Sequence, residues 1–306
     1  MARIFLRAWF LLLAITLLPQ AMAANVALVL SDNGGPYAEF ATSFEEYSSK
    51  SHWKVSYVGK VDGQDKAPAR PDLIIAVGSE AFRATLALGG NTPILATLIP
   101  RNSYEKILAE SGRSKQRGST SAIVLDQPPA RLGAFIRQLL PSHQRVGLLS
   151  SAETYSQLPA FRQTFGGLII DSEDVSGDPA LLGALNNLMP RVNLLLALPD
   201  STIYKRENIK SILVTTFRYQ RPVIAFSKAF VTAGALAAIY STPSQLARQS
   251  ADLLLTLPAG ATSLPAIQMP SQFAISINSN VAQSLNLDLP DETSLRRALQ
   301  ADGAPK

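Results

Sequence analysis

The sequence predicts an α/β protein built from two doubly wound parallel-sheet (Rossmann-like) lobes that are joined by a hinge. Three short apolar runs occur in the first half of the chain and recur in the same order in the second half, and segments with helical periodicity separate them. Strands that alternate with helices favour right-handed βαβ units and a parallel sheet. The 306 residues are enough for two domains of ordinary size.

The repeated runs are apolar nearly throughout, which is typical of strands covered on both faces. They lie 120, 121 and 129 residues apart, and pair residues 26–31 with 146–151, 72–79 with 193–201, and 93–97 with 222–227. Three matches in one order favour two lobes of similar architecture.

Helical patterns fill the gaps between these runs. Apolar and aromatic residues fall on one helical face from Tyr37 to Tyr47 and again from Leu132 to Leu140. Thr242-Pro243 predicts a further helix start, because threonine is a good N-cap and proline suits the first helical position.

Residues 1–23 have the pattern of a secretory signal peptide. Arg3 and Arg7 precede an apolar run over residues 8–18, and Ala21-Met-Ala23 fits the small-x-small cleavage rule. We therefore expect cleavage near Ala23. The alternative is an uncleaved membrane anchor, but the run is shorter than the ~20 residues that span a bilayer.

Composition and motifs exclude several functions. The absence of cysteine excludes disulfides, thiol catalysis and a lipid anchor on an N-terminal cysteine. The net charge of +5 is small and spread out, which argues against nucleic-acid binding. His52 and His143 are expected to be surface residues without catalytic partners. The patterns G-x-S-x-G, G-x-G-x-x-G and G-x-x-x-x-G-K-[ST] are absent. We expect no cofactor, no metal and no enzymatic activity.

Polar residues follow the predicted strands at points where α/β sheets bind ligands. Asp200-Ser201 ends a strand of the second lobe, Ser79 holds the equivalent place in the first, and residues 31–33 end another strand. Each of these residues is also a favoured helix cap. The two interpretations are compatible, because a capped helix N-terminus is itself an anion site.

The chain resembles the ABC-transporter substrate-binding proteins of the periplasmic binding protein type I fold, in the branch that includes tryptophan- and tyrosine-binding members. The resemblance rests on residues 139–149, 198–203, 222–240 and 273–290, which include Pro222-Val-Ile-Ala-Phe-Ser-Lys228 and Phe273-Ala-Ile-Ser-Ile-Asn278. It departs from the family at residues 97–103, where relatives often carry Asp-Pro. Many members of the branch are lipoproteins, whereas this chain has no cysteine.

The resemblance implies two lobes that close like a Venus flytrap on a small molecule. The signal peptide would be residues 1–23, the first lobe 25–126 plus 228–270, and the second 127–227 plus 271–306. It also implies that the ligand is an amino acid or a similar small organic solute. We expect a free, monomeric periplasmic protein that delivers this ligand to an inner-membrane ABC permease.

If the ligand is an amino acid, the residue chemistry predicts roles. Ser79 at a helix start suits the carboxylate and Asp200 suits the ammonium. Aromatic residues are expected either to clamp the ligand or to pack against helices, and Lys228 either to bind an anion or to neutralise Asp200. The predicted ligand-binding set is Ser31, Asp32, Asn33, Tyr37, Ser79, Thr97, Tyr155, Asp200, Ser201, Tyr204, Phe226, Ser227 and Lys228.

Two other functions stay open. The protein could present its ligand state to a membrane sensor or another envelope partner without transport. It could also be an enzyme that uses carboxylates in the cleft, although no spacing of carboxylates in the sequence supports that activity.

Overall fold

The computed structural model describes residues 24–49, 51–61, 70–112, 118–175, 180–258 and 260–301. The predicted signal peptide, residues 1–23, lies outside these ranges. Within them, no helix is both long and apolar enough to cross a membrane.

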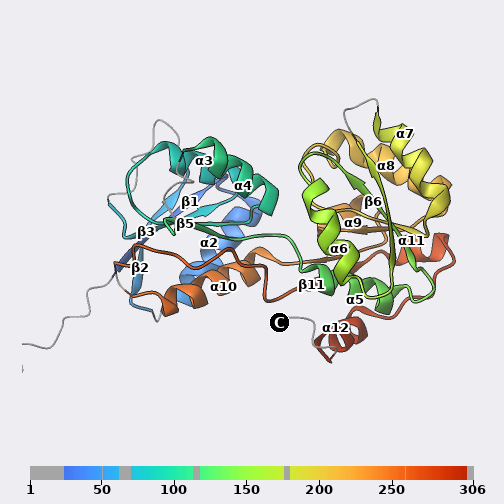
Figure 1. The fold of residues 1–306 in the computed structure, drawn as a ribbon. Coiled ribbons are helices and arrows are strands. Elements are labelled where there is room, and N and C mark those ends of the chain that lie inside the picture. Colours follow the sequence, from blue (N-terminus) through green and yellow to red (C-terminus); the bar gives the residue numbers. More distant parts are fainter. Residues whose placement is uncertain are drawn as a thin grey trace, which may run out of the picture.

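Lobe one is a five-stranded, wholly parallel sheet with helices on both faces, in the strand order β2-β1-β3-β4-β5. Its strands are β1 (Ala24–Leu30), β2 (Trp53–Gly59), β3 (Leu73–Val77), β4 (Ile94–Thr97) and β5 (Thr120–Ile123). One face packs on α2 (Gly35–Ser48) and α10 (Pro243–Thr256), and the other on α3 (Ser79–Ala87) and α4 (Arg101–Glu110). Figure 1 shows α10 beside α2 despite their distance in sequence.

Lobe two is a six-stranded sheet in the order β11-β10-β9-β8-β6-β7, parallel except for β11. Its strands are β6 (Arg145–Ser150), β7 (Ile169–Asp174), β8 (Leu194–Leu196), β9 (Val223–Ala225), β10 (Ala237–Tyr240) and β11 (Ala274–Ile277). On one face lie α5 (Pro129–Leu139), α6 (Leu158–Thr164), α11 (Ser279–Ser284) and α12 (Glu292–Ala301). On the other lie α7 (Ala180–Leu188), α8 (Arg206–Arg218) and α9 (Lys228–Ala233). Two short turns of 3₁₀ helix are η2 (Tyr155–Gln157) and η3 (Met189–Arg191).

The repeat seen in the sequence is confirmed by the sheet topology. The three apolar runs of the first half form β1, β3 and β4, which are neighbours, and their counterparts form β6, β8 and β9, which are neighbours in the same sequence order. Strands β3, β4, β8 and β9 are buried along their whole length, as expected for strands covered by helices on both faces.

The predicted helices are confirmed as well. The face from Tyr37 to Tyr47 belongs to α2, whose Phe40 and Phe44 are fully buried in lobe one. Thr242 starts α10 with a capping box, in which its hydroxyl accepts from the Gln245 N–H and the Gln245 side chain accepts from the Thr242 N–H.

One predicted boundary is corrected by the strand pairing. Residues 228–270 were expected in lobe one, but α9 packs in lobe two and β10 pairs with β9 and β11 of the second sheet. The chain re-enters lobe one only at the start of α10. We therefore propose lobes of 24–126 plus 242–270 and of 127–241 plus 271–301.

Three described segments cross between the lobes and form the hinge, at residues 124–128, 241–242 and 269–273. Figure 1 shows the two lobes side by side with these segments running between them. Side chains tie the segments together. Gln127 Nε2 donates to Ser241 Oγ at 2.9 Å, and Ser241 Oγ donates to the Gln272 carbonyl at 2.6 Å.

Arg131 is the central residue of the hinge. Its side chain has an exposed fraction of 0%, and its Nη1 donates to Gln127 Oε1 at 2.7 Å and to the Pro270 carbonyl at 3.0 Å. Nη2 donates to the Ser271 carbonyl at 3.3 Å, and the guanidinium lies 5.0 Å from the ring centroid of Phe273. Burial lowers the pKa of Arg131 to about 10, so it stays charged at neutral pH.

We expect Arg131→Met to lower the free energy of unfolding by about 3 kcal/mol, because the methionine fills a similar volume but leaves buried carbonyl oxygens without donors. Urea unfolding measures the change. Arg248→Met, which replaces an exposed arginine of α10, is the control and should change the stability little. Equal losses in the two variants would contradict the role given to Arg131.

Candidate functional site

Each lobe has a topological switch point at the carboxyl ends of two central strands. In lobe one, α2 follows β1 onto one face of the sheet and α3 follows β3 onto the other. In lobe two, α6 follows β6 onto one face and α8 follows β8 onto the other. Ligands of open α/β sheets bind outside the carboxyl ends of strands at such points.

The switch point of lobe one joins β1 to the start of α3. Ser31 Oγ, at the end of β1, accepts a hydrogen bond from the Ala81 N–H at 2.9 Å. Gly78 caps α3 with a φ of 96°, and a Cβ at this position would lie 2.7 Å from Cε1 of Tyr37 and would also overlap the Ser31 hydroxyl. Only glycine therefore allows β1, α2 and α3 to meet this closely.

Tyr37, in the first turn of α2, contributes its phenol group to the switch point of lobe one. Burial raises its pKa, and the charges of Asp32 and Glu80 raise it further. Asp32 Oδ1 accepts from the Gly34 N–H at 3.0 Å, and Asp32 itself is exposed. The phenol thus remains a hydrogen-bond donor at neutral pH.

The other predicted residues of lobe one differ in exposure. Asn33 is exposed, and Ser79 is half-buried as the first residue of α3, whose N-cap residue Gly78 has no side chain. Thr97 is fully buried, and its hydroxyl has no hydrogen-bond partner among the described residues. The structure therefore brings Ser31, Asp32, Tyr37 and Ser79 together and places Thr97 behind them in the sheet.

Asp200 organises the switch point of lobe two. Its Oδ2 accepts from the hydroxyls of Ser151 at 2.6 Å and Thr154 at 2.8 Å. Its Oδ1 accepts from the backbone N–H groups of Thr202 at 2.9 Å and Ile203 at 3.0 Å. With four donors and only 4% of its surface exposed, this carboxylate is saturated within the protein. It acts as a cap for the loop after β8, which is one of the two interpretations that the sequence left open.

Ser201 and Tyr155 surround this cap. The hydroxyl of Ser201 donates to Glu153 Oε1 at 2.7 Å and its N–H donates to Glu153 Oε2 at 2.9 Å. Sequence reasoning missed Glu153, because nothing in the local pattern around it indicates a partner 48 residues away. Tyr155 is 67% exposed and borders a cavity of about 620 Å³ at the ends of β6 and β7.

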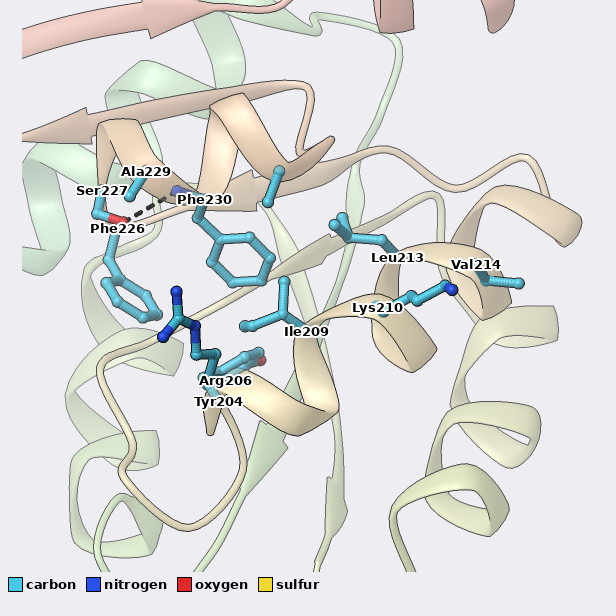
Figure 2. A pocket seen from close by; sticks show the side chains of 11 residues that line it. Tyr204, Arg206, Ile209, Lys210, Leu213, Val214, Phe226, Ser227, Ala229 and Phe230 are labelled. Atoms are coloured by element: carbon cyan, nitrogen blue, oxygen red, sulfur yellow. Dashed lines mark hydrogen bonds between the residues drawn. The ribbon is translucent and has the colours of Figure 1, made fainter.

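The remaining predicted residues lie in a different part of lobe two. Tyr204, Phe226 and Ser227 line a pocket of about 580 Å³ between α8 and α9 (Figure 2). Ser227 caps α9 by accepting from the Phe230 N–H at 3.2 Å. Lys228 is exposed, and within the described residues it forms no ion pair with Asp200. The thirteen-residue ligand set therefore divides among three places, and its role in binding stays a prediction.

His52 and His143 lie outside the two switch points. Both are half-buried, and burial together with the charge of Arg221 lowers the pKa of His143. Among the described residues, no group of His, Asp or Glu side chains is arranged to hold a metal ion.

One hydrogen bond joins the two lobes near the carboxyl ends of their strands. Gln157, at the end of η2 after β6, donates from Nε2 to Oδ1 of Asn102, in the first turn of α4 after β4, at 2.6 Å. This contact brings together segments that follow the carboxyl ends of strands in different lobes. Tyr155 is the first residue of the same 3₁₀ turn, two residues before Gln157.

Comparison with known proteins identifies the architecture. No protein-family model and no curated protein sequence matches the chain. A solved structure of an ABC domain from Streptococcus pneumonia in complex with L-Trp matches with a TM-score of 0.61 at 14% identity, over 90% of this chain and 98% of that chain. The fold is that of a type I periplasmic binding protein.

Another match to this type I fold is the ligand-free, open structure of a substrate-binding protein with adhesive properties from Clostridium difficile. It has a TM-score of 0.63 at 14% identity, over 88% of this chain and 96% of that chain. A conserved domain protein from Vibrio cholerae matches with a TM-score of 0.59 at 15% identity, over 90% and 98% of the two chains. The predicted fold is confirmed by these likenesses.

We expect Gly78→Ala to lower the free energy of unfolding by about 2 kcal/mol or more, because the new Cβ adds a clash to an unfavourable φ. Gly89→Ala is the matched control, since Gly89 also has a positive φ, of 71°, but has nothing within 4 Å of its added Cβ. It should cost about 1 kcal/mol. Thermal or urea unfolding compares the two, and a Gly89 variant as unstable as the Gly78 variant would refute the steric argument.

The stability of the protein should depend on pH through Asp126, which lies in the first crossing. Burial is the largest effect on its carboxyl group, and it raises the pKa of Asp126. The hydrogen bond from the Arg101 N–H, at 2.7 Å, and the charge of Arg101 both lower the pKa, whereas the charge of Glu105 raises it. The net result is a raised pKa. The native state therefore binds this proton more tightly than the unfolded chain. The contribution of Asp126 to stability falls as pH rises from about 3.9 through the raised pKa.

We expect Asp126→Asn to gain stability relative to the parent protein between pH 4 and pH 7, because asparagine keeps an acceptor for Arg101 and does not ionise. Asp291→Asn should show the opposite trend, because hydrogen bonds from Ser294 lower the pKa of Asp291 and its stabilisation is lost as pH falls. Urea unfolding at several pH values tests both. A stability difference for Asp126→Asn that does not change with pH would contradict the prediction.

Proposed function

We propose that the protein is a periplasmic solute-binding protein that captures a small organic molecule, an amino acid or a similar solute, between its lobes for ABC-type import. The observation that carries the proposal is a switch point in each lobe, with one hydrogen bond between the lobes near the carboxyl ends of their strands and a hinge of three crossings. Two such edges on either side of a hinge can enclose a ligand from both sides. The leader pattern of residues 1–23 supports the periplasmic location.

The saturation of Asp200 changes the ligand scheme. A carboxylate that already accepts four hydrogen bonds gains little from an ammonium group, so we assign the ammonium to Asp32, which is exposed at the edge of lobe one. The ligand carboxylate would lie at the start of α3, where Gly78 has no side chain and the Ser31 hydroxyl accepts only from the Ala81 N–H, and it would bind the N–H groups of the first two helical residues. Both groups then bind lobe one.

The two lobes divide the work of recognition. Tyr37 in lobe one and the exposed ring of Tyr155 in lobe two offer aromatic surfaces for an apolar or aromatic side chain. A ligand bound to lobe one would thus attract lobe two through Tyr155 and favour the closed state. The Asn102–Gln157 hydrogen bond, which is already formed in this structure, links the lobes two residues from Tyr155.

Binding is tested with the protein from Ala24 onward, purified and stripped of ligand by mild unfolding. Native mass spectrometry before stripping detects a bound solute, and thermal shift against amino acids, purines and sugars then identifies its class. Ligand at about 100 times its dissociation constant should add about 2.7 kcal/mol of stability. A protein that carries no solute and that no solute stabilises would overturn the proposal.

We expect Tyr155→Ala to weaken ligand binding by about tenfold, because it removes an aromatic contact from the face of lobe two. Phe217→Ala, at an aromatic residue of α8 that is 50% exposed, is the matched control and should leave the affinity unchanged. Asp32→Asn should weaken an amino acid but not its deaminated analogue. Titration calorimetry measures all three, and equal affinity of the parent and Tyr155→Ala would exclude the proposed clamp.

A further inference from the structure

The pocket between α8 and α9 is built entirely from lobe two. Its base is formed by Tyr204, Phe226 and Phe230, whose ring centroids lie 5.7–5.9 Å apart in edge-to-face pairs. Aliphatic side chains of α8, among them Ile209 and Leu213, complete the apolar wall (Figure 2). The volume of about 580 Å³ is within the range of small-molecule sites, roughly 300–1,000 Å³.

Two positively charged side chains line this apolar pocket. Arg206 and Lys210 lie one helical turn apart on α8, both are exposed and both line the pocket. Figure 2 shows Arg206 pointing from α8 toward the side of the pocket that Phe226 forms. Within the described ranges of the chain, neither side chain forms an ion pair.

The position of these cations is unfavourable for the helix itself. They occupy the first two turns of α8, where the helix dipole disfavours positive charge, and like charges four residues apart repel each other. Glu207 is the acid in the first turn and offsets only part of this charge. A local conflict of this kind is expected where a residue serves a ligand rather than the fold.

We propose that this pocket is a second binding site, separate from the space between the lobes, for a small amphipathic organic anion. The apolar or aromatic body would rest on Phe226 and Phe230, and the carboxylate or sulfonate would pair with Arg206 and Lys210. Ser227 keeps its hydroxyl in the cap of α9 and takes no part in binding the anion.

The site is tested with a matched pair of probes. Anilinonaphthalene sulfonate is an aromatic anion whose fluorescence rises in apolar sites, and phenylnaphthylamine has the same rings without the charge. In the protein from Ala24 onward, the double variant Arg206→Gln/Lys210→Gln should weaken the sulfonate by about tenfold and leave the neutral probe nearly unchanged.

Matched variants separate the site from net charge and from the gap between the lobes. Lys54→Gln/Lys106→Gln removes the same charge from exposed positions in lobe one and should not change either probe. Ala229→Trp fills the pocket from an exposed position of α9 and should abolish binding of both probes. Tyr155→Ala should weaken the solute of the proposed function but not the sulfonate, so the two proposals fail or succeed independently.

The proposal is overturned if Arg206→Gln/Lys210→Gln weakens the sulfonate no more than the control pair does. It is also overturned if Ala229→Trp, shown to be folded by circular dichroism, binds both probes as the parent protein does.

Discussion

The buried guanidinium of Arg131 is the contact on which the two-lobed arrangement depends. An arginine without exposure is costly unless it forms hydrogen bonds, and here Nη1 and Nη2 donate to Gln127 and to two carbonyl groups of the third crossing. One side chain thereby fixes two crossings relative to each other, and Gln127 extends the network to the second crossing through Ser241. This small polar network joins all three crossings.

The two switch points are held in place by contacts within each lobe. Gly78 lets three elements of lobe one meet, and Asp200 holds the loop after β8 by its four hydrogen bonds. These groups support the loops that carry the exposed Asp32 and Tyr155, the two residues proposed to contact the ligand. The division between support and contact explains why a carboxylate at a strand end need not be a ligand group.

The strands and main helices could be predicted because their signal is local. Continuous apolar runs indicate strands covered on both faces, and the spacing of Phe40 and Phe44 indicates a helix. The boundary near residue 241 could not, because the strands on either side of a crossing have the same composition and only their pairing assigns them to a lobe. The role of Asp200 was undecidable for a similar reason, since two of its donors lie 46 and 49 residues away in sequence. Arg131 gave no signal at all, because an arginine in an amphipathic helix normally reaches solvent.

The crossings also mean that neither lobe is a contiguous piece of chain. The core of lobe one is completed by Leu246 and Leu254 of α10, and the indole of Trp53 donates to the Leu254 carbonyl at 2.9 Å across 201 residues. The core of lobe two is likewise completed by β11 and α12, near the C-terminal end of the described chain. Contacts of such long range slow folding. Neither lobe can therefore complete its core until the C-terminal segments of the chain have been synthesised.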